Sequence, residues 1–136
     1  MTLLSAADPD CGLIENVNRA MRAAGHVDGA AFDIALDITE SFYVRREVHP
    51  FVLASGSGVV AAAALRRLIA DAMADEGFGV RMSRDFTPHM TLMWADRWVD
   101  EYPVLPIHWT VREFALILSH VGKSRHEHLA KWALRG

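Results

Sequence analysis

The sequence predicts an α+β domain in which antiparallel strands alternate with two main helices. Residues 13–24 and 59–76 each carry apolar side chains at the helical period. Residues 32–39 alternate apolar and polar side chains, as expected of a strand with one solvated face, and further short strand-like segments follow. The 136 residues and the 51% hydrophobic content suit one domain, residues 1–136, with a genuine core.

Composition limits the classes of function. A net charge of −3 gives no global basic field, which disfavours tight binding of long nucleic acid but leaves room for a local patch that recognises an RNA end or a small nucleotide. A single cysteine excludes an internal disulfide and suits a reducing cytoplasm. Residues 1–7 are too short and too poor in basic residues for a signal peptide, and no apolar run approaches the ~20 residues needed to span a bilayer. We therefore expect a cytoplasmic domain without membrane contact.

The N-terminal residues predict a strand end followed by a helix. Residues 1–5 have the pattern of the tail of a strand, and Asp8 is a candidate N-cap with Pro9 in the first helical turn. Gly25 is expected just beyond the end of this helix. Cys11 falls in the first turn, where a helix dipole could lower a thiol pKa, but no partner base lies nearby in the sequence and a packing role is favoured.

Three strands are expected before the second helix, at residues 32–39, 41–48 and 51–54. Asp33 and Asp37 share a face of the first strand, where they could bind a cation, although a solvated outer face is the favoured interpretation. The second of these strands carries Arg45 and Arg46.

The second helix is expected over residues 59–76, ending at Gly77. Residues 55–58, Ser-Gly-Ser-Gly, precede it and could cradle a phosphate, but they lack the Gly-Lys-Ser/Thr ending of a P-loop, so a flexible turn is favoured. The helical period predicts that the helix exposes Arg66, Arg67 and Asp75 and packs the apolar side chains of Leu65, Leu68, Ile69, Ala72 and Met73.

The most informative stretch is residues 84–94. Pro88 fixes its own φ and makes its predecessor extended, so a strand begins at His89. Alternation then places His89 and Thr91 on one side, about 6.5–7 Å apart, so that both can reach one phosphate-sized group. An imidazole can give or take a proton near neutral pH, and a hydroxyl can hold an oxyanion. The alternative is a structural strand histidine. Phe86 and Trp94 flank the motif and could stack on a base, although core packing is the commoner use of such aromatics.

The C-terminal part predicts an irregular segment and a hairpin. Residues 96–106 are interrupted by two prolines, and residues 107–119 form a long strand. A turn at residues 122–125 precedes residues 126–134, whose pattern fits a returning strand or a helix.

The histidines of this part allow two site hypotheses. His120, His126 and His128 could form a three-histidine zinc site, although no carboxylate or cysteine stands at a convincing spacing. Alternatively, Arg125 and His126 help to hold a substrate phosphate.

The segment Phe86-Thr87-Pro88-His89-Met90-Thr91-Leu92 resembles the second His-x-Thr signature of the two-histidine (2H) phosphoesterases, the superfamily of bacterial 2′-5′ RNA ligase-like proteins. The resemblance implies a pseudo-symmetric bilobal fold of antiparallel sheets with two main helices packed outside. It also implies two such motifs that face each other across a cleft. Met1-Thr2-Leu3-Leu4 matches a first motif without its histidine, so the chain is expected to lack one strand, one helix and that residue. The pattern Arg125-His126-x-x-Leu129-x-x-Trp132 is similar to the family's C-terminal hairpin and favours a closing strand.

What the resemblance implies for function is an RNA 2′,3′-cyclic phosphodiesterase or 2′-5′ RNA ligase that needs no metal or other cofactor. One histidine would take a proton from the attacking water or hydroxyl, and the other would protonate the leaving ribose oxygen. Catalytic roles then map onto His89, Thr91 and Thr2, and substrate-binding roles onto Arg125, His126 and Phe86. Without the first histidine the chain is expected to be impaired.

Other outcomes stay open at this point. The expected partner is an RNA end with a 2′,3′-cyclic phosphate or a small cyclic nucleotide, with 2′-5′ oligonucleotides and cyclised ADP-ribose derivatives also compatible. A homodimer could cover an exposed sheet edge. The alternatives are a non-catalytic module that binds RNA ends or nucleotides, and a metal-dependent hydrolase that uses the C-terminal histidines.

Overall fold

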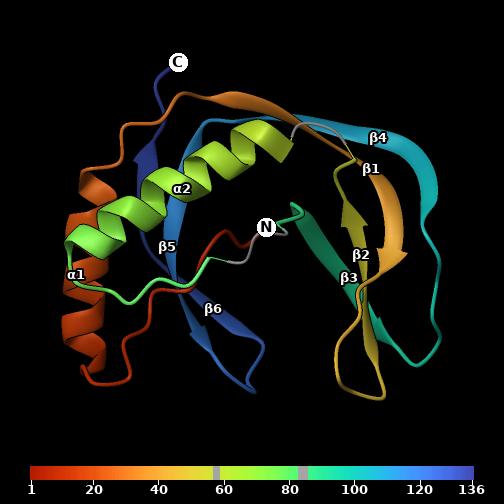
Figure 1. Cartoon of the computed structure of the whole chain (residues 1–136), viewed down its shortest axis with the longest axis horizontal. Helices are drawn as coiled ribbons and strands as arrows, with labels where there is room; N and C mark the ends of the chain where they lie inside the picture. The colour runs from red at the N-terminus through yellow and green to blue at the C-terminus, as the bar shows by residue number, and fades with distance from the viewer. Residues whose placement is uncertain (57–58, 83–85) are drawn as a thin grey trace. The chain divides into compact units, whose positions relative to one another are not determined.

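The computed structural model describes residues 1–56, 59–82 and 86–136 (Figure 1). It is an α+β chain with two helices and antiparallel strands, which confirms the predicted fold class. The helices and strands follow in the order α1 (Leu13–Gly25), β1 (Phe32–Ser41), β2 (His49–Ala54), α2 (Val59–Asp75), β3 (His89–Ala95), β4 (Tyr102–Val111), β5 (Glu113–His120) and β6 (Arg125–Ala133). Among the described residues, no helix combines the length and the apolar character needed to cross a bilayer.

The chain divides into two compact units. The first, here called the sheet unit, consists of Met1–Leu3, Asp33–Ala63 and Ser83–Thr110. It contains a four-stranded sheet in the order β3-β2-β1-β4, so β3 and β4 are its edge strands (Figure 1). Strands β1 and β2 pair antiparallel, as do β2 and β3. The largest fully buried side chains, at most 1% exposed, include those of Ile34, Leu36 and Val52 on the central strands.

The second unit, here called the helical unit, consists of Leu4–Phe32, Ala64–Met82 and Val111–Gly136. Strands β5 and β6 form its antiparallel hairpin, with Phe114 and Trp132 stacked at a ring separation of 5.4 Å. Its core brings together Ala20 and Ala23 of α1, Met73 of α2 and Phe78, which follows α2.

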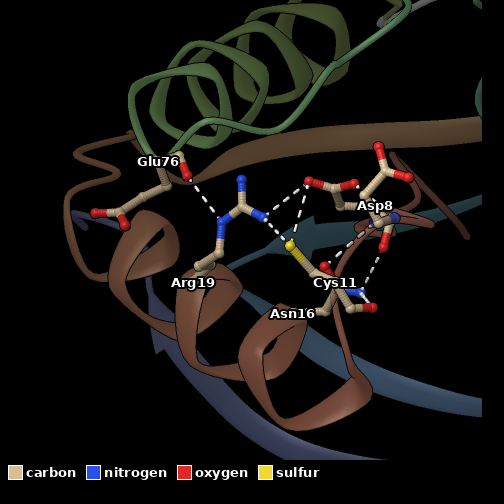
Figure 2. A network of polar contacts seen from close by, with 6 residues as sticks. Asp8, Cys11, Asn16, Arg19 and Glu76 are labelled. Carbon is tan, nitrogen blue, oxygen red and sulfur yellow. Dashed lines mark hydrogen bonds and ion pairs between the residues drawn. The ribbon is translucent and has the colours of Figure 1, made fainter.

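Arg19, a buried arginine of α1, binds both Asp8, in the turn before α1, and Glu76, which follows α2 (Figure 2). The Arg19 side chain donates from Nε to the Glu76 carbonyl oxygen at 2.9 Å and from Nη1 to the Asp8 carboxylate at 2.9 Å. Nη1 also lies 3.1 Å from Cys11 Sγ, and the guanidinium covers the Phe78 ring at 4.4 Å. A buried cation is tolerated because it is paired and hydrogen-bonded in this way. Asn16 completes the network by donating from Nδ2 to the carbonyl oxygens of Asp8 and Cys11.

Three predictions for the N-terminal part are wrong. Residues 1–5 form no strand, and α1 begins at Leu13 after Gly12 as N-cap, four residues later than a cap at Asp8 would place it. Asp8 instead closes its own turn, because its carboxylate accepts from the Asp10 N–H and its carbonyl accepts from the Cys11 N–H. Gly25 is the last helical residue and not the residue beyond the end.

The strand predicted at residues 41–48 is also wrong. β1 continues to Ser41, and no strand is formed before β2 begins at His49, two residues earlier than predicted. The loop between them includes the exposed Arg45 and Arg46.

Helix α2 is confirmed in its extent and differs in its buried face. Arg66 is only 8% exposed, whereas Leu68, expected in the core, is 40% exposed. The buried stripe of α2 runs through Ala62, Leu65, Arg66, Ala70 and Met73, at the spacings of three and four residues that a helix requires. The predicted stripe is therefore rotated by about one residue.

The C-terminal strands differ from prediction in two respects. β4 begins at Tyr102 and contains both Pro103 and Pro106, which an edge strand tolerates because one of its sides needs no donors. The predicted long strand at 107–119 is in fact two strands, since Arg112 separates β4 from β5 and the two belong to different sheets. β6 confirms the returning strand, and its helical alternative is wrong.

Candidate functional site

The backbone around His89 is held firmly within the sheet unit. Pro88 is fully buried, and its carbonyl oxygen accepts a hydrogen bond from the Ser55 N–H at 3.0 Å. His89 follows as the first residue of β3, directly opposite Ala54 of β2. The strand start that Pro88 predicts is therefore confirmed. The His89 side chain projects from a fixed, extended backbone.

The imidazole of His89 is oriented by two contacts. Its Nδ1 atom lies 2.8 Å from the carbonyl oxygen of Thr87. A carbonyl oxygen can only accept, so Nδ1 carries the proton and Nε2 carries the lone pair of the neutral ring. The Phe42 ring packs edge-on against the imidazole, with ring centres 4.8 Å apart and an interplanar angle of 68°. A half-buried imidazole with a fixed tautomer is suited to accepting a proton at Nε2 and returning it.

Thr91 shares the face of the sheet on which His89 lies. In the antiparallel pairing, His89 stands opposite Ala54 and Thr91 opposite Val52. Residues opposite each other lie on one face, and Ala54 and Val52 are two positions apart, so the two side chains point the same way. The alternation predicted from the sequence is correct here. The Thr91 side chain is exposed, which leaves its hydroxyl accessible.

Two further predicted site residues belong to the same unit. Phe86 is half-buried and lies shortly before His89. Thr2 is exposed and lies in a segment that forms neither helix nor strand. Their assignments to substrate binding and to catalysis stay predictions.

Arg125 and His126 are brought to the start of β6 in the helical unit. His120 stands opposite Arg125, and Ser119 stands opposite His126. Adjacent strand residues point to opposite faces, so only one of the two side chains can reach a ligand on a given face of the hairpin. Nη2 of Arg125 lies 4.0 Å from the Glu127 carboxylate, and Nε2 of His120 lies 3.3 Å from the same carboxylate.

The three-histidine zinc site is not formed. His126 and His128 share a face of β6, opposite Ser119 and Ile117, whereas His120 lies on the other face. The part of the chain that the structure describes contains no group of three histidine, cysteine or acidic side chains placed to hold a metal ion.

The two aspartates of β1 make contacts within the sheet unit. Asp33 accepts a hydrogen bond from the Thr110 hydroxyl at 2.6 Å, and Asp37 accepts one from the Gly56 N–H at 2.8 Å. Each carboxylate thus has a hydrogen-bond donor within the protein, and its position needs no bound cation to explain it. The rest of the glycine-rich turn, residues 57–58, lies outside the described residues.

A helix dipole does not lower the pKa of Cys11, and the packing role favoured from the sequence is consistent with its position. Cys11 precedes α1, and burial together with the charges of Asp8 and Glu15 raises the pKa of its thiol. A raised pKa keeps the sulfur protonated, which argues against a nucleophilic role.

Phe42 contacts the candidate histidine and is not indicated by sequence analysis. It lies 47 positions before His89, in a loop segment after β1, and its backbone N–H donates to the Pro50 carbonyl oxygen. No local pattern marks it, because its contact with His89 arises only when β1, β2 and β3 are assembled.

Several solved structures share this fold. A crystal structure described as a phosphoesterase superposes with a TM-score of 0.70 at 21% sequence identity, covering 99% of this chain and 76% of that one. E. coli LigT complexed with NADP+ gives a TM-score of 0.65 at 21% identity, covering 93% of this chain and 71% of that one. TT0787 of Thermus thermophilus gives 0.68 at 19% identity, covering 96% of this chain and 74% of that one.

These similarities define the class of fold. The chain has the LigT-like phosphoesterase fold, as the resemblance to 2H phosphoesterases predicted. No protein-family model matches the chain, and no curated protein matches its sequence. E. coli LigT has also been crystallised with 3′-AMP, with ATP and with phosphate.

Proposed function

We propose that this chain is a 2H phosphoesterase-like protein that acts on an RNA end or a small nucleotide bearing a 2′,3′-cyclic phosphate. The observation that carries the proposal is the fixed His89 imidazole, with Nδ1 bound to the Thr87 carbonyl, on the same face of the sheet as the Thr91 hydroxyl. The LigT-like fold supports it, because E. coli LigT has been crystallised with phosphate and with nucleotides.

The chemistry follows from these two side chains. Hydrolysis forms a bond between a water oxygen and phosphorus and breaks the bond from phosphorus to one ribose oxygen. Nε2 of His89 either takes the proton of the water or, as imidazolium, gives one to the leaving ribose oxygen. The Thr91 hydroxyl donates a hydrogen bond to a non-bridging oxygen as negative charge builds up on it. By the same resemblance Thr2 supplies a second hydroxyl and Phe86 contributes to binding, as does whichever of Arg125 and His126 lies on the ligand's face of the hairpin.

The first experiment measures hydrolysis of an oligoribonucleotide with a 2′,3′-cyclic phosphate end by the full gene product and by His89→Asn. An asparagine amide can still donate to the Thr87 carbonyl, so the variant keeps the local structure while losing the titratable nitrogen. We expect the rate to fall by about 10²- to 10⁴-fold. The protein must carry no N-terminal histidine tag, because a histidine placed before Met1-Thr2 would itself create a His-x-Thr sequence.

The same experiment decides between catalysis and binding alone. If the wild type and His89→Asn hydrolyse the substrate at the same rate, the catalytic proposal fails. Binding of the uncleaved oligonucleotide is then measured directly, and a specific affinity would favour the alternative, a module that binds RNA ends or nucleotides without turnover.

A further inference from the structure

We infer that Trp94 is the base-stacking residue of this site, holding the nucleobase of the nucleotide whose phosphate lies at His89 and Thr91. The inference rests on the proposed function and adds to it a base-recognition element. Strands β2 and β3 are neighbours in the sheet (Figure 1), and the inference rests on the register in which their residues pair.

A shift in that register brings Trp94 to the face of His89. Five positions separate the two residues, and in a regular strand an odd spacing would place their side chains on opposite faces. In the structure, however, Thr91 stands opposite Val52 and Met93 stands opposite Phe51, so Leu92 is an extra residue without a partner of its own. Such a β-bulge reverses the alternation beyond it.

The pairing on β2 confirms where Trp94 lies. Trp94 stands opposite Pro50, which is two positions from Val52 and four from Ala54. Pro50, Val52 and Ala54 therefore share one face of β2, and their partners Trp94, Thr91 and His89 share the same face of the sheet. Two paired positions correspond to about 7 Å along a strand, so the backbone positions of Thr91 and Trp94 are separated by roughly that distance.

The indole is available for a ligand. Trp94 is 52% exposed, although it is a large apolar residue on a strand. Within the described residues, the ring pairs in contact are Phe42 with His89, Tyr43 with His49, His49 with Trp98, and Phe114 with Trp132, so none of them uses Trp94. An exposed indole on the same face as a phosphate-binding pair is suited to stacking on a base.

Stacking also fits the charge of the chain. A net charge of −3 offers no general attraction to a long polyanion. Base stacking on an aromatic side chain does not depend on such a field and accepts any base, because every base has a π-face. One stacked base beside one held phosphate recognises a single terminal nucleotide.

The test compares nucleotide binding by the wild type, Trp94→Leu and Trp98→Leu. Trp98 is a matched control, because it is 51% exposed and belongs to the same unit. It contacts Asp100 and His49, and His49 is adjacent to Pro50 and therefore lies on the other face of β2. Calorimetry measures the affinity for adenosine 2′,3′-cyclic monophosphate and, in parallel, for inorganic phosphate. We expect Trp94→Leu to weaken binding of the cyclic nucleotide by about 5- to 100-fold and to leave phosphate binding unchanged. Trp98→Leu should alter neither affinity.

The inference is overturned if Trp94→Leu binds the cyclic nucleotide as the wild type does, or if the wild type binds it no better than phosphate. Either result would leave the proposed phosphate chemistry to stand on its own assay with His89→Asn. Equal loss of nucleotide and phosphate binding in Trp94→Leu would also overturn it, since that pattern indicates general damage to the site.

Discussion

The Nδ1 atom of His89 lies 2.8 Å from the carbonyl oxygen of Thr87, two residues earlier in the chain. The segment thus supplies its own orienting group for the histidine. Pro88 between them is buried and fixes the extended path that brings the carbonyl back to the ring. Because this acceptor is a main-chain atom, substitution of Thr87 does not remove it, and the tautomer of His89 is determined by the backbone.

For turnover, the hydroxyl of Thr91 should matter more than the branched shape of the side chain. Thr91→Val keeps the branched side chain on β3 but removes the donor to the phosphate oxygen, and we expect a loss of about 10²- to 10³-fold in turnover of a cyclic-phosphate substrate. Thr91→Ser keeps the donor and should retain most of the activity. Steady-state kinetics of the two variants test this directly, and equal activity of the valine and serine variants would remove Thr91 from the mechanism.

Sequence patterns predict the shared face of the candidate pair His89 and Thr91 because its determinants are local. A proline before His89 and an alternation of two residues suffice to place His89 and Thr91 on one face. The same rule fails for Trp94, since a β-bulge is a property of pairing with β2 and leaves no mark in the sequence of β3 alone. The contact of Phe42 with His89 was missed for a similar reason, because it depends on three strands.

The errors in the fold also have a physical pattern. The predicted start of α1 is wrong because a short-range side-chain hydrogen bond competes with the helix. The Asp8 carboxylate closes a turn instead of capping α1. The two prolines of β4 predict an interruption of the strand, but an edge strand accommodates them. The helical period predicts Arg66 on the solvated face of α2, yet it lies on the buried stripe, which is rotated by about one residue.

The ion pair of Asp8 with Arg19 should make the folded chain less stable as the pH falls into the acid range. The hydrogen bond from Arg19 holds the pKa of Asp8 below its ordinary value of about 3.9, so the pair stabilises the fold fully above that pH. As the pH falls below about 4, the unfolded chain takes up the proton first and the contribution shrinks, disappearing below the folded-state pKa.

Urea denaturation of the wild type and Asp8→Asn tests this sign. We expect a lower urea midpoint for Asp8→Asn at pH 7 and a difference that narrows as the pH is lowered below about 4. Asp10→Asn is the matched control, because Asp10 is exposed and only its main-chain N–H contacts Asp8. A difference that widens in acid would contradict the assigned pairing.

The Cys11 thiol should react slowly. Burial, followed by the charges of Asp8 and Glu15, raises its pKa, so less thiolate is present at a given pH than for an ordinary cysteine of pKa about 8.5. The pH dependence of alkylation by iodoacetamide should therefore have its midpoint above that value. Asp8→Asn removes a negative neighbour and should move the midpoint down, whereas Asp10→Asn should not. A midpoint below about 8.5 in the wild type would show that Arg19 outweighs the acidic groups.

Two glycines at helix ends should respond in opposite ways to alanine. Gly77 follows α2 with φ of +84°, and the next N–H, that of Phe78, reaches back to the Met73 carbonyl at 3.0 Å, which is the bond of a Schellman ending. A Cβ at Gly77 would also stand 3.0 Å from Nη2 of Arg19. We expect Gly77→Ala to lower the free energy of unfolding by about 1–2 kcal/mol, because a left-handed backbone is strained for any residue with a Cβ.

Gly25 is the internal comparison for that prediction. It is the last residue of α1, has no positive φ, and a Cβ built there meets no atom within 4 Å. Gly25→Ala should therefore be neutral or stabilise the protein by up to about 1 kcal/mol, since alanine favours the helical backbone. Urea denaturation of both variants measures the difference. Equal effects would mean that the backbone at Gly77 is not held in the left-handed region in solution, and with it the close packing of Arg19 against the end of α2 would be in question.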